Sequence, residues 1–178
     1  EGGNDIVYLN LQAARLGILD LERFKRQVHY ATLPNQTVAD LVLQRGGRYD
    51  DMTKYNYMAP MGIWFENFAL PVVINECLMQ SYNGRIRLFP NWDRNTDAAF
   101  STLRAVGAFL VSCKLSGGQI RELSLLSEKG KPCTVVNPWG ESASVTLVRN
   151  GQPAETLTGN TITFKTSVDE RIELRLKN

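Results

Sequence analysis

The stretch W-F-E-N-F-A-L-P-V-V-I-N-E-C-L-M-Q-S-Y-N-G-R-I-R-L-F-P-N-W, from Trp64 to Trp92, contains the point at which the chain changes its periodicity. Its first part has apolar side chains three and four residues apart in two adjacent stripes, which predicts a buried helix from about Asn67 with Pro71 in its first turn. The pair Asn83-Gly84 predicts a turn, and R-I-R-L-F after it alternates like a strand. The sequence therefore predicts helices before this point and β structure after it.

The residues before this stretch repeat at the helical period. From Asp5 to about Thr32, apolar residues recur every three to four positions, and Gly17 followed by Asp20 provides a helix stop and a new N-cap. This pattern predicts a pair of amphipathic helices joined as an αα hairpin. Residues 34–61 then predict a long loop, which compact domains rarely contain unless it lines a site or packs against another domain.

The residues after this stretch predict short strands separated by turns. Alternating or β-rich runs cover 103–115, 120–126, 133–136, 144–148, 161–165 and 172–176, with glycine turns between several of them. Six or seven short strands at this spacing indicate an antiparallel β-sandwich. The expected fold class is α+β, with N-terminal helices in residues 1–82 and a C-terminal β-sandwich in residues 83–178. The few helices are too thin a unit to cover their own apolar faces, so we expect them to be the end of a larger helical domain.

Composition excludes several classes of function. The chain has 178 residues, is 43% hydrophobic and has a formal net charge of +2 without charge blocks, so we expect neither nucleic acid nor a membrane as a partner, and no membrane insertion. The three cysteines are widely spaced in apolar surroundings and predict buried free thiols. With His29 as the sole histidine, we expect no metal site and no cofactor. The chain does not begin with Met, which indicates a processed form or a piece of a longer chain.

Two sets of residues are candidates for a site. Glu66 and Asn67 lie at the start of the predicted helix, where the helix dipole favours an anion, and the alternative for Glu66 is an ordinary capping acid. The loop before them carries Tyr55, Tyr57 and Trp64 together with Asp51. Flat rings beside carboxylates and amides are typical of sugar binding, and the alternative is packing at a domain interface.

The sequence resembles the C-terminal part of glycoside hydrolase family 95. The resemblance rests on E-N-F-A-L-P-V-V-I-N-E-C-L-M-Q-S-Y-N-G-R-I-R-L-F-P-N-W, then L-R-A-V-G-A-F-L-V-S, then G-G-Q-I-R-E-L-S-L-L-S-E-K-G, which keep the family's order and spacing over residues 62–130. That family, which includes α-L-fucosidases and α-galactosidases, has a six-hairpin (α/α)6 barrel followed by a β-sandwich. The resemblance implies that residues 1–82 are the end of such a barrel and that the sandwich follows it.

The resemblance also implies a function and marks a departure from it. It implies a secreted or periplasmic enzyme that hydrolyses a carbohydrate substrate by inversion, with the rest of the barrel as the partner of these helices. The family's general acid and base lie upstream, so this chain lacks them and is expected to be inactive in isolation. Phe65 and Glu66 stand where the family has D-G before Asn67 and Phe68. A branch with another glycoside substrate fits this departure, and the alternative function is a non-catalytic carbohydrate-binding or structural β-sandwich module.

Overall fold

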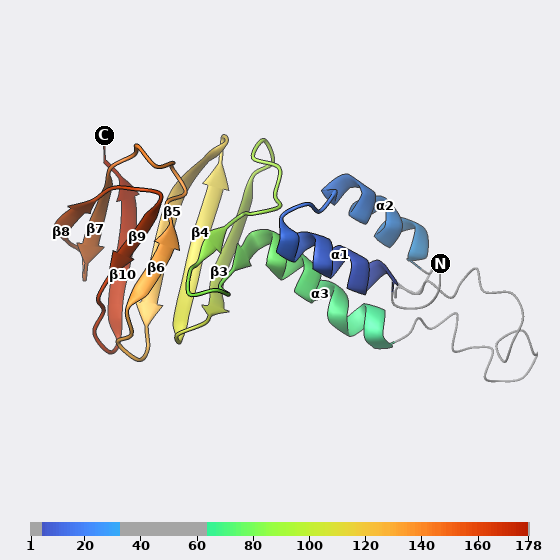
Figure 1. The fold of residues 1–178 in the computed structure, drawn as a ribbon, viewed down its shortest axis with the longest axis horizontal. Helices are drawn as coiled ribbons and strands as arrows, with labels where there is room; N and C mark the ends of the chain where they lie inside the picture. The colour runs from blue at the N-terminus through green and yellow to red at the C-terminus, as the bar shows by residue number, and fades with distance from the viewer. Residues whose placement is uncertain (1–4, 33–63, 178) are drawn as a thin grey trace, which may run out of the picture. The chain divides into compact units, whose positions relative to one another are not determined.

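The fold is α+β, and the described residues form three helices and mostly antiparallel sheets (Figure 1). A computed structural model describes residues 5–32 and 64–177. The chain divides into two compact units, residues 1–77 and residues 78–178. The described residues of the first unit are helical and those of the second form β structure, as the change in periodicity predicts.

The helical hairpin forms where the sequence predicts it. Helix α1 (Asp5–Leu16) ends at Gly17, whose φ of 74° lets its N–H donate to the Ala14 carbonyl at 3.1 Å. Helix α2 (Leu21–Ala31) begins after Asp20, whose carboxylate accepts from the Arg23 N–H at 2.8 Å. The glycine stop and the acidic N-cap are both confirmed.

The three helices share a small apolar core. Ile6 and Val7 of α1, Phe24 of α2, and Leu70 and Val73 of α3 (Trp64–Leu78) form one buried cluster. Polar contacts supplement this cluster at two places. The Asn10 side chain of α1 donates to the Gln27 side chain of α2 at 2.9 Å, and Arg15 pairs with Glu76 of α3 at 3.2 Å.

Helix α3 differs from the sequence prediction at its start. It begins at Trp64 and not at Asn67, so Pro71 is its eighth residue and lies inside the helix. The prediction of Pro71 in the first turn is therefore wrong. Proline cannot donate to the carbonyl four residues earlier, so the helix lacks one of its hydrogen bonds at that position. The apolar packing of Leu70 and Val73 on either side of Pro71 offsets that loss.

The larger layer of the second unit is a six-stranded antiparallel sheet. Its order is β3 (Ala98–Ala105), β4 (Phe109–Ser116), β5 (Gln119–Ser127), β10 (Glu170–Leu176), β7 (Val145–Arg149) and β8 (Gln152–Leu157). Gly117 and Gly118 both have positive φ and make the tight turn between β4 and β5. Strand β10 lies between β5 and β7 and joins the two halves of the sheet.

The smaller layer consists of two short pairs. Strands β1 (Met79–Gln80) and β2 (Arg87–Leu88) pair around a turn in which Asn83 and Gly84 have φ of 55° and 69°, as the N-G dipeptide predicts. Strands β6 (Cys133–Val136) and β9 (Thr161–Phe164) form the second pair. A parallel bridge between Ile86 and Val135 connects the two pairs.

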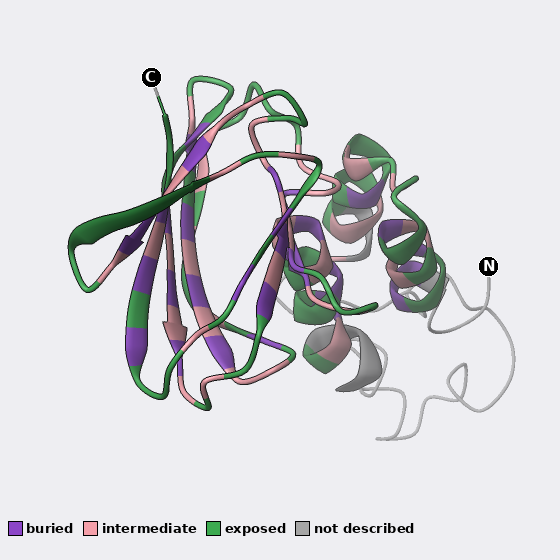
Figure 2. Ribbon diagram, turned by 60° about the vertical axis from the view of Figure 1, so that its left-hand side comes forward, coloured by how far each residue is buried: buried purple, intermediate pink, exposed green. Residues whose placement is uncertain are grey.

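One hydrophobic core lies between the layers of this unit. Along β4 the alternate residues Phe109, Val111, Cys113 and Leu115 are buried, and their neighbours are more exposed. Figure 2 shows buried and more exposed residues alternating along strands of the sandwich. Ile86, Val135 and Ile162 come into the same cluster from the smaller layer. Period-two burial on facing layers is the packing of a β-sandwich, which confirms the predicted fold class.

Two strands differ from the predicted pattern. Residues 103–115 were expected as one run, but Gly107 and Ala108 have φ of 97° and 62° and divide it into the hairpin β3–β4. Strand β8 was not predicted, because its side chains are nearly all exposed and show no alternation. Pro153 in β8 and a register shift opposite it, between Leu147 and Val148, make this edge of the sheet a poor template for further strands.

Candidate functional site

The residues singled out from the sequence lie at the start of α3 and before it. Glu66 and Asn67 are the third and fourth residues of α3, and Trp64 is its first. The side chains of these three residues lie outside the part of the chain that the structure describes, as do Asp51, Tyr55 and Tyr57 entirely. Their roles in catalysis and sugar binding remain predictions.

The other end of α3 contains a carboxylate and a thiol. Glu76 pairs with the exposed Arg15 of α1, and the next residue, Cys77, is buried. Burial raises the pKa of the Cys77 thiol to about 11, and the negative charge of Glu76 acts in the same direction. Cys77 is therefore protonated at neutral pH and lacks the thiolate that a nucleophile requires.

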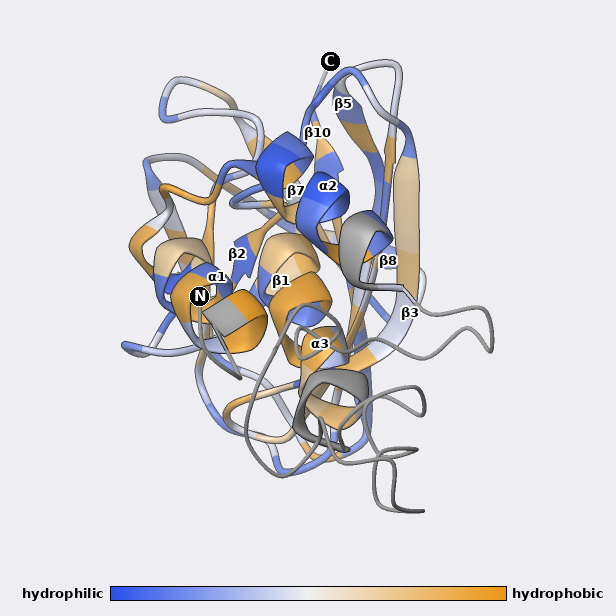
Figure 3. Ribbon diagram, turned by 90° about the vertical axis from the view of Figure 1, so that its right-hand side faces the viewer, coloured by the Kyte–Doolittle hydropathy of each residue, from blue (hydrophilic) through white to orange (hydrophobic). Residues whose placement is uncertain are grey.

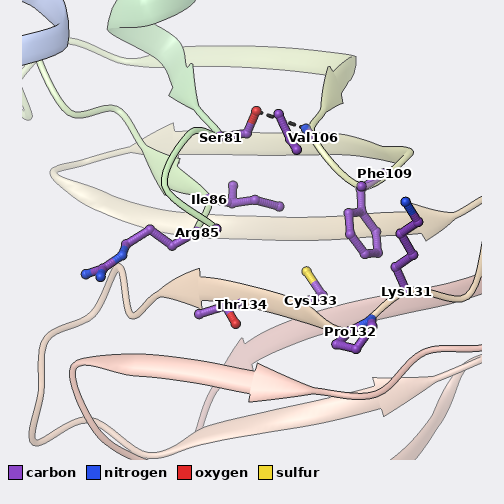
Figure 4. A pocket seen from close by; sticks show the side chains of 11 residues that line it. Ser81, Arg85, Ile86, Val106, Phe109, Lys131, Pro132, Cys133 and Thr134 are labelled. Atoms are coloured by element: carbon purple, nitrogen blue, oxygen red, sulfur yellow. Dashed lines mark hydrogen bonds between the residues drawn. The ribbon is translucent and has the colours of Figure 1, made fainter.

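A pocket of about 220 Å³ opens in the sandwich unit (Figure 4). Three chain segments surround it: the β1–β2 connection, the turn between β3 and β4, and the segment that leads into β6. The β1–β2 connection contributes Ser81 and residues 84–86. The β3–β4 turn contributes Val106, Gly107 and Phe109, and the segment before β6 contributes residues 131–134. Pairing of Ile86 with β6 and a hydrogen bond between Val106 and Ser81 bring together three segments that are far apart in the sequence.

The floor of the pocket is apolar. Ile86, Phe109 and Cys133 are almost fully buried, and their side chains lie in the middle of the group of side chains in Figure 4. Burial raises the pKa of the Cys133 thiol to about 12. This cysteine therefore contributes an apolar surface to the floor and not a reactive thiolate.

The rim of the pocket is polar and cationic. In Figure 4 the Arg85 and Lys131 side chains stand on opposite sides, with the apolar floor residues between them. The Ser81 hydroxyl accepts a hydrogen bond from the Val106 N–H at 3.0 Å, which leaves its own O–H as a donor. None of the residues that line the pocket is acidic.

Backbone hydrogen bonds fix the shape of the pocket. The Ile86 N–H donates to the Thr134 carbonyl and the Val136 N–H donates to the Ile86 carbonyl, each at 2.8 Å. Gly107 lies so close to Phe109 that an added Cβ would stand 2.7 Å from its ring. The walls are therefore part of the sheet framework, and a ligand would meet a preformed surface.

No local pattern in the sequence indicates this pocket. Arg85 and Ile86 belong to the predicted strand after Asn83-Gly84, but Lys131 is 46 positions after Arg85 (131 − 85 = 46) in a stretch with no motif. The parallel bridge between Ile86 and Val135 places them on one pocket, and a local pattern cannot reveal such a pairing. The glycine before Lys131, a turn signal, was the only local feature at that position.

The described residues show neither a metal site nor a membrane-spanning helix. Within residues 5–32 and 64–177, no group of three or more His, Cys, Asp or Glu side chains is placed to hold a metal ion. No helix in the same part of the chain is long and apolar enough to cross a membrane.

Comparisons with known proteins give matches among solved structures alone. No family model matches the chain, and no curated protein matches it. A GH30 endoxylanase from Clostridium papyrosolvens C71 is similar over 41% of this chain and 21% of its own, with 10% identity and a TM-score of 0.32. A GH127 β-L-arabinofuranosidase from Geobacillus stearothermophilus T6 is similar over 62% of this chain and 18% of its own, with 13% identity and a TM-score of 0.33. The chain thus spans about a fifth of the length of each.

Proposed function

We propose that this chain is the C-terminal part of a glycoside hydrolase that acts on glycans. In this proposal, α1 to α3 belong to the wall of an (α/α)6 barrel of the family 95 type, and the sandwich is the domain that follows the barrel. The enzyme is periplasmic or extracellular, and its substrate is a carbohydrate. The isolated chain is inactive because it lacks the general acid and base.

The observation that carries this proposal is the apolar surface of α3. Figure 3 shows α3 mainly hydrophobic and α2 mainly hydrophilic. Leu70, Val73 and Cys77 of α3 are buried, but Phe68 is 77% exposed, Ile74 46% and Val72 40%. A helix that is apolar nearly all round belongs inside a larger helical assembly, and exposed apolar residues of this size mark a surface that another element covers.

The order of the elements supports the same proposal. The resemblance to family 95 places a strand after the last barrel helix, then the L-R-A-V-G-A-F-L-V segment, then a glycine hairpin. The structure has β2 after α3, the β3–β4 hairpin at Gly107, and the β4–β5 turn at Gly117 and Gly118. A barrel of helical hairpins would also give the exposed side of α3 the neighbours it lacks in the described part of the chain.

The proposal assigns roles to the predicted site residues. Inverting hydrolysis requires two groups that flank the scissile bond with room for a water molecule between them. Glu66, at the first turn of α3, supplies a further carboxylate that helps to organise the base, and Asn67, the next residue, orients the water or the sugar. Trp64, Tyr55 and Tyr57 provide faces for sugar rings, and Asp51 accepts hydrogen bonds from sugar hydroxyls. The rest of the barrel supplies the missing acid and base.

An antibody raised against this chain tests the proposal. The producing cells and their medium are immunoblotted and then depleted with the antibody, with pre-immune antibody as the control. We expect a band several times longer than 178 residues, and loss of hydrolysis of at least one aryl glycoside in a broad panel. A band near 20.0 kDa, or a longer band whose removal leaves every glycosidase activity unchanged, would overturn the proposal.

A further inference from the structure

We infer that the sandwich pocket is a binding site for an anionic oligosaccharide, carboxylated or sulfated, held by Arg85 and Lys131 over an apolar floor. The inference rests on the proposed function only in the choice of a sugar as the carrier of the negative charge. The charge, the size and the lining of the pocket come from the structure itself.

The two cationic side chains of the pocket have no ion-pair partner among the described residues. Neither the Arg85 nor the Lys131 side chain takes part in any hydrogen bond or ion pair of the described residues. Other arginines of the same unit are paired with carboxylates, Arg104 with Glu128 and Arg149 with Glu170. None of the described residues that line the pocket is acidic, so the lining has a local positive charge that suits an anionic ligand.

The lining also suits a sugar ring. A volume of about 220 Å³ equals that of about seven water molecules. Such a space admits one sugar ring of an oligosaccharide, above a floor that the buried Ile86 and Phe109 close from below. The free O–H of Ser81 can donate to a ring hydroxyl or to the acidic group. Thr134, whose hydroxyl pairs with that of Thr163 at 2.9 Å, is already occupied and serves as wall.

The positions of the cations favour an extended ligand. Arg85 and Lys131 stand on opposite sides of the floor residues (Figure 4), so acidic groups toward the two ends of an extended glycan can reach one cation each. Arginine binds carboxylate and sulfate oxygens with two parallel N–H donors, and lysine binds them as a point charge. The net charge of +2 gives no broad positive surface, so the pocket suits a short anionic glycan and not a nucleic acid.

The preformed walls reduce the ordering that binding requires. Backbone hydrogen bonds between Ile86 and β6 hold the floor, and the Ser81–Val106 contact holds the rim. A ligand therefore orders mainly the two long cationic side chains. Binding should weaken as the salt concentration rises, because the charges on the rim are exposed.

The test is a titration of the whole 178-residue chain. Trigalacturonate and a sulfated galactotriose are compared with neutral galactotriose and with propane-1,2,3-tricarboxylate, by calorimetry and by amide chemical shifts in NMR spectra. The variant Arg85→Ala/Lys131→Ala removes the cations of the pocket. The matched control, Lys165→Ala/Arg171→Ala, removes one lysine and one arginine that lie outside the pocket lining and are exposed.

We expect an acidic trisaccharide to bind, with shifts centred on Val106, Gly107 and Thr134, and about tenfold weaker binding in the pocket variant than in the control. The tighter of the two acidic sugars identifies the source of the charge. No binding at millimolar concentrations, equal binding of galactotriose or of the tricarboxylate, or equal loss in both variants would each overturn the inference. Because these readouts measure binding alone, their failure leaves the hydrolase proposal to its own antibody experiment.

Discussion

Replacing Asn137 with alanine should destabilise the sandwich. This side chain is 5% exposed and lies just after β6. Its amide donates to the Ala143 carbonyl at 3.1 Å and to the Gly159 carbonyl at 3.0 Å, and its oxygen accepts from the Trp139 N–H at 3.2 Å. Asn137 thus joins three turns that share no regular strand pairing at this point.

The magnitude follows from these contacts. Each net hydrogen bond contributes about 0.5–1.5 kcal/mol, so removing all three lowers the free energy of unfolding by about 2–4 kcal/mol. With a urea slope of about 2 kcal/mol per molar, the midpoint should fall by about 1–2 M. Asn137→Asp keeps the shape but replaces the donor of two hydrogen bonds by an acceptor that faces two carbonyls, so it should lose a similar amount at neutral pH.

The assay is urea unfolding followed by tryptophan fluorescence in a Trp64→Phe background, in which Trp92 and Trp139 report on the sandwich alone. The control is Asn160→Ala in the neighbouring turn, because Asn160 is exposed and only its backbone carbonyl bonds to Asn137. This control should change stability by less than about 0.5 kcal/mol. If Asn137→Ala stayed within the same range, the assignment of Asn137 as the link between these turns would be refuted.

Two further changes test other contacts of the sandwich, by the same urea assay. Gly130→Ala should destabilise the sandwich more than Gly84→Ala. The two glycines have similar φ values, 62° and 69°, so the backbone strain of an alanine is matched. The added Cβ at Gly130 would lie 3.0 Å from the Val168 nitrogen, whereas that at Gly84 has no atom within 4 Å. Equal losses would show that the close approach is irrelevant. Burial acts to raise the pKa of Glu170, but hydrogen bonds from the Ser167 N–H and from Arg149 outweigh it and lower this pKa. Its contribution is therefore present above its ordinary pKa of 4.5 and is lost as the pH falls through the lowered value. The stability gap between the protein and Glu170→Gln should narrow in acid, and a gap independent of pH would contradict this account.

Local signals predicted the parts of the fold that local chemistry determines. Gly17 and Asp20 predicted the hairpin of α1 and α2, because a glycine with positive φ and an N-cap acid each act within one helical turn. Asn83-Gly84 announced the turn before β2 for the same reason. The alternation of apolar residues gave the sandwich its class, since each strand of a sandwich buries one face.

Sequence patterns failed where tertiary contacts override them. Pro71 suggested a helix start, but the packing of Leu70 and Val73 against α1 and α2 supports a helix that continues through it. Strand β8 has no buried face to produce alternation, so its pairing with β7 alone determines it. The pocket was missed because the bridge between Ile86 and Val135 is a long-range contact with no local sign.

The place of β10 in the sheet imposes an order on the folding of the sandwich. Strands β3, β4 and β5 are joined by tight turns and pair with their neighbours in sequence, so this meander can form as soon as its residues leave the ribosome. The β7–β8 hairpin can do the same. Residues 170–176 lie between the two parts, so until they are synthesised each part has an unpaired strand edge. Completion of the sheet during synthesis thus depends on β10, and a nascent chain that stalls before residue 170 presents two additional open edges, on β5 and β7.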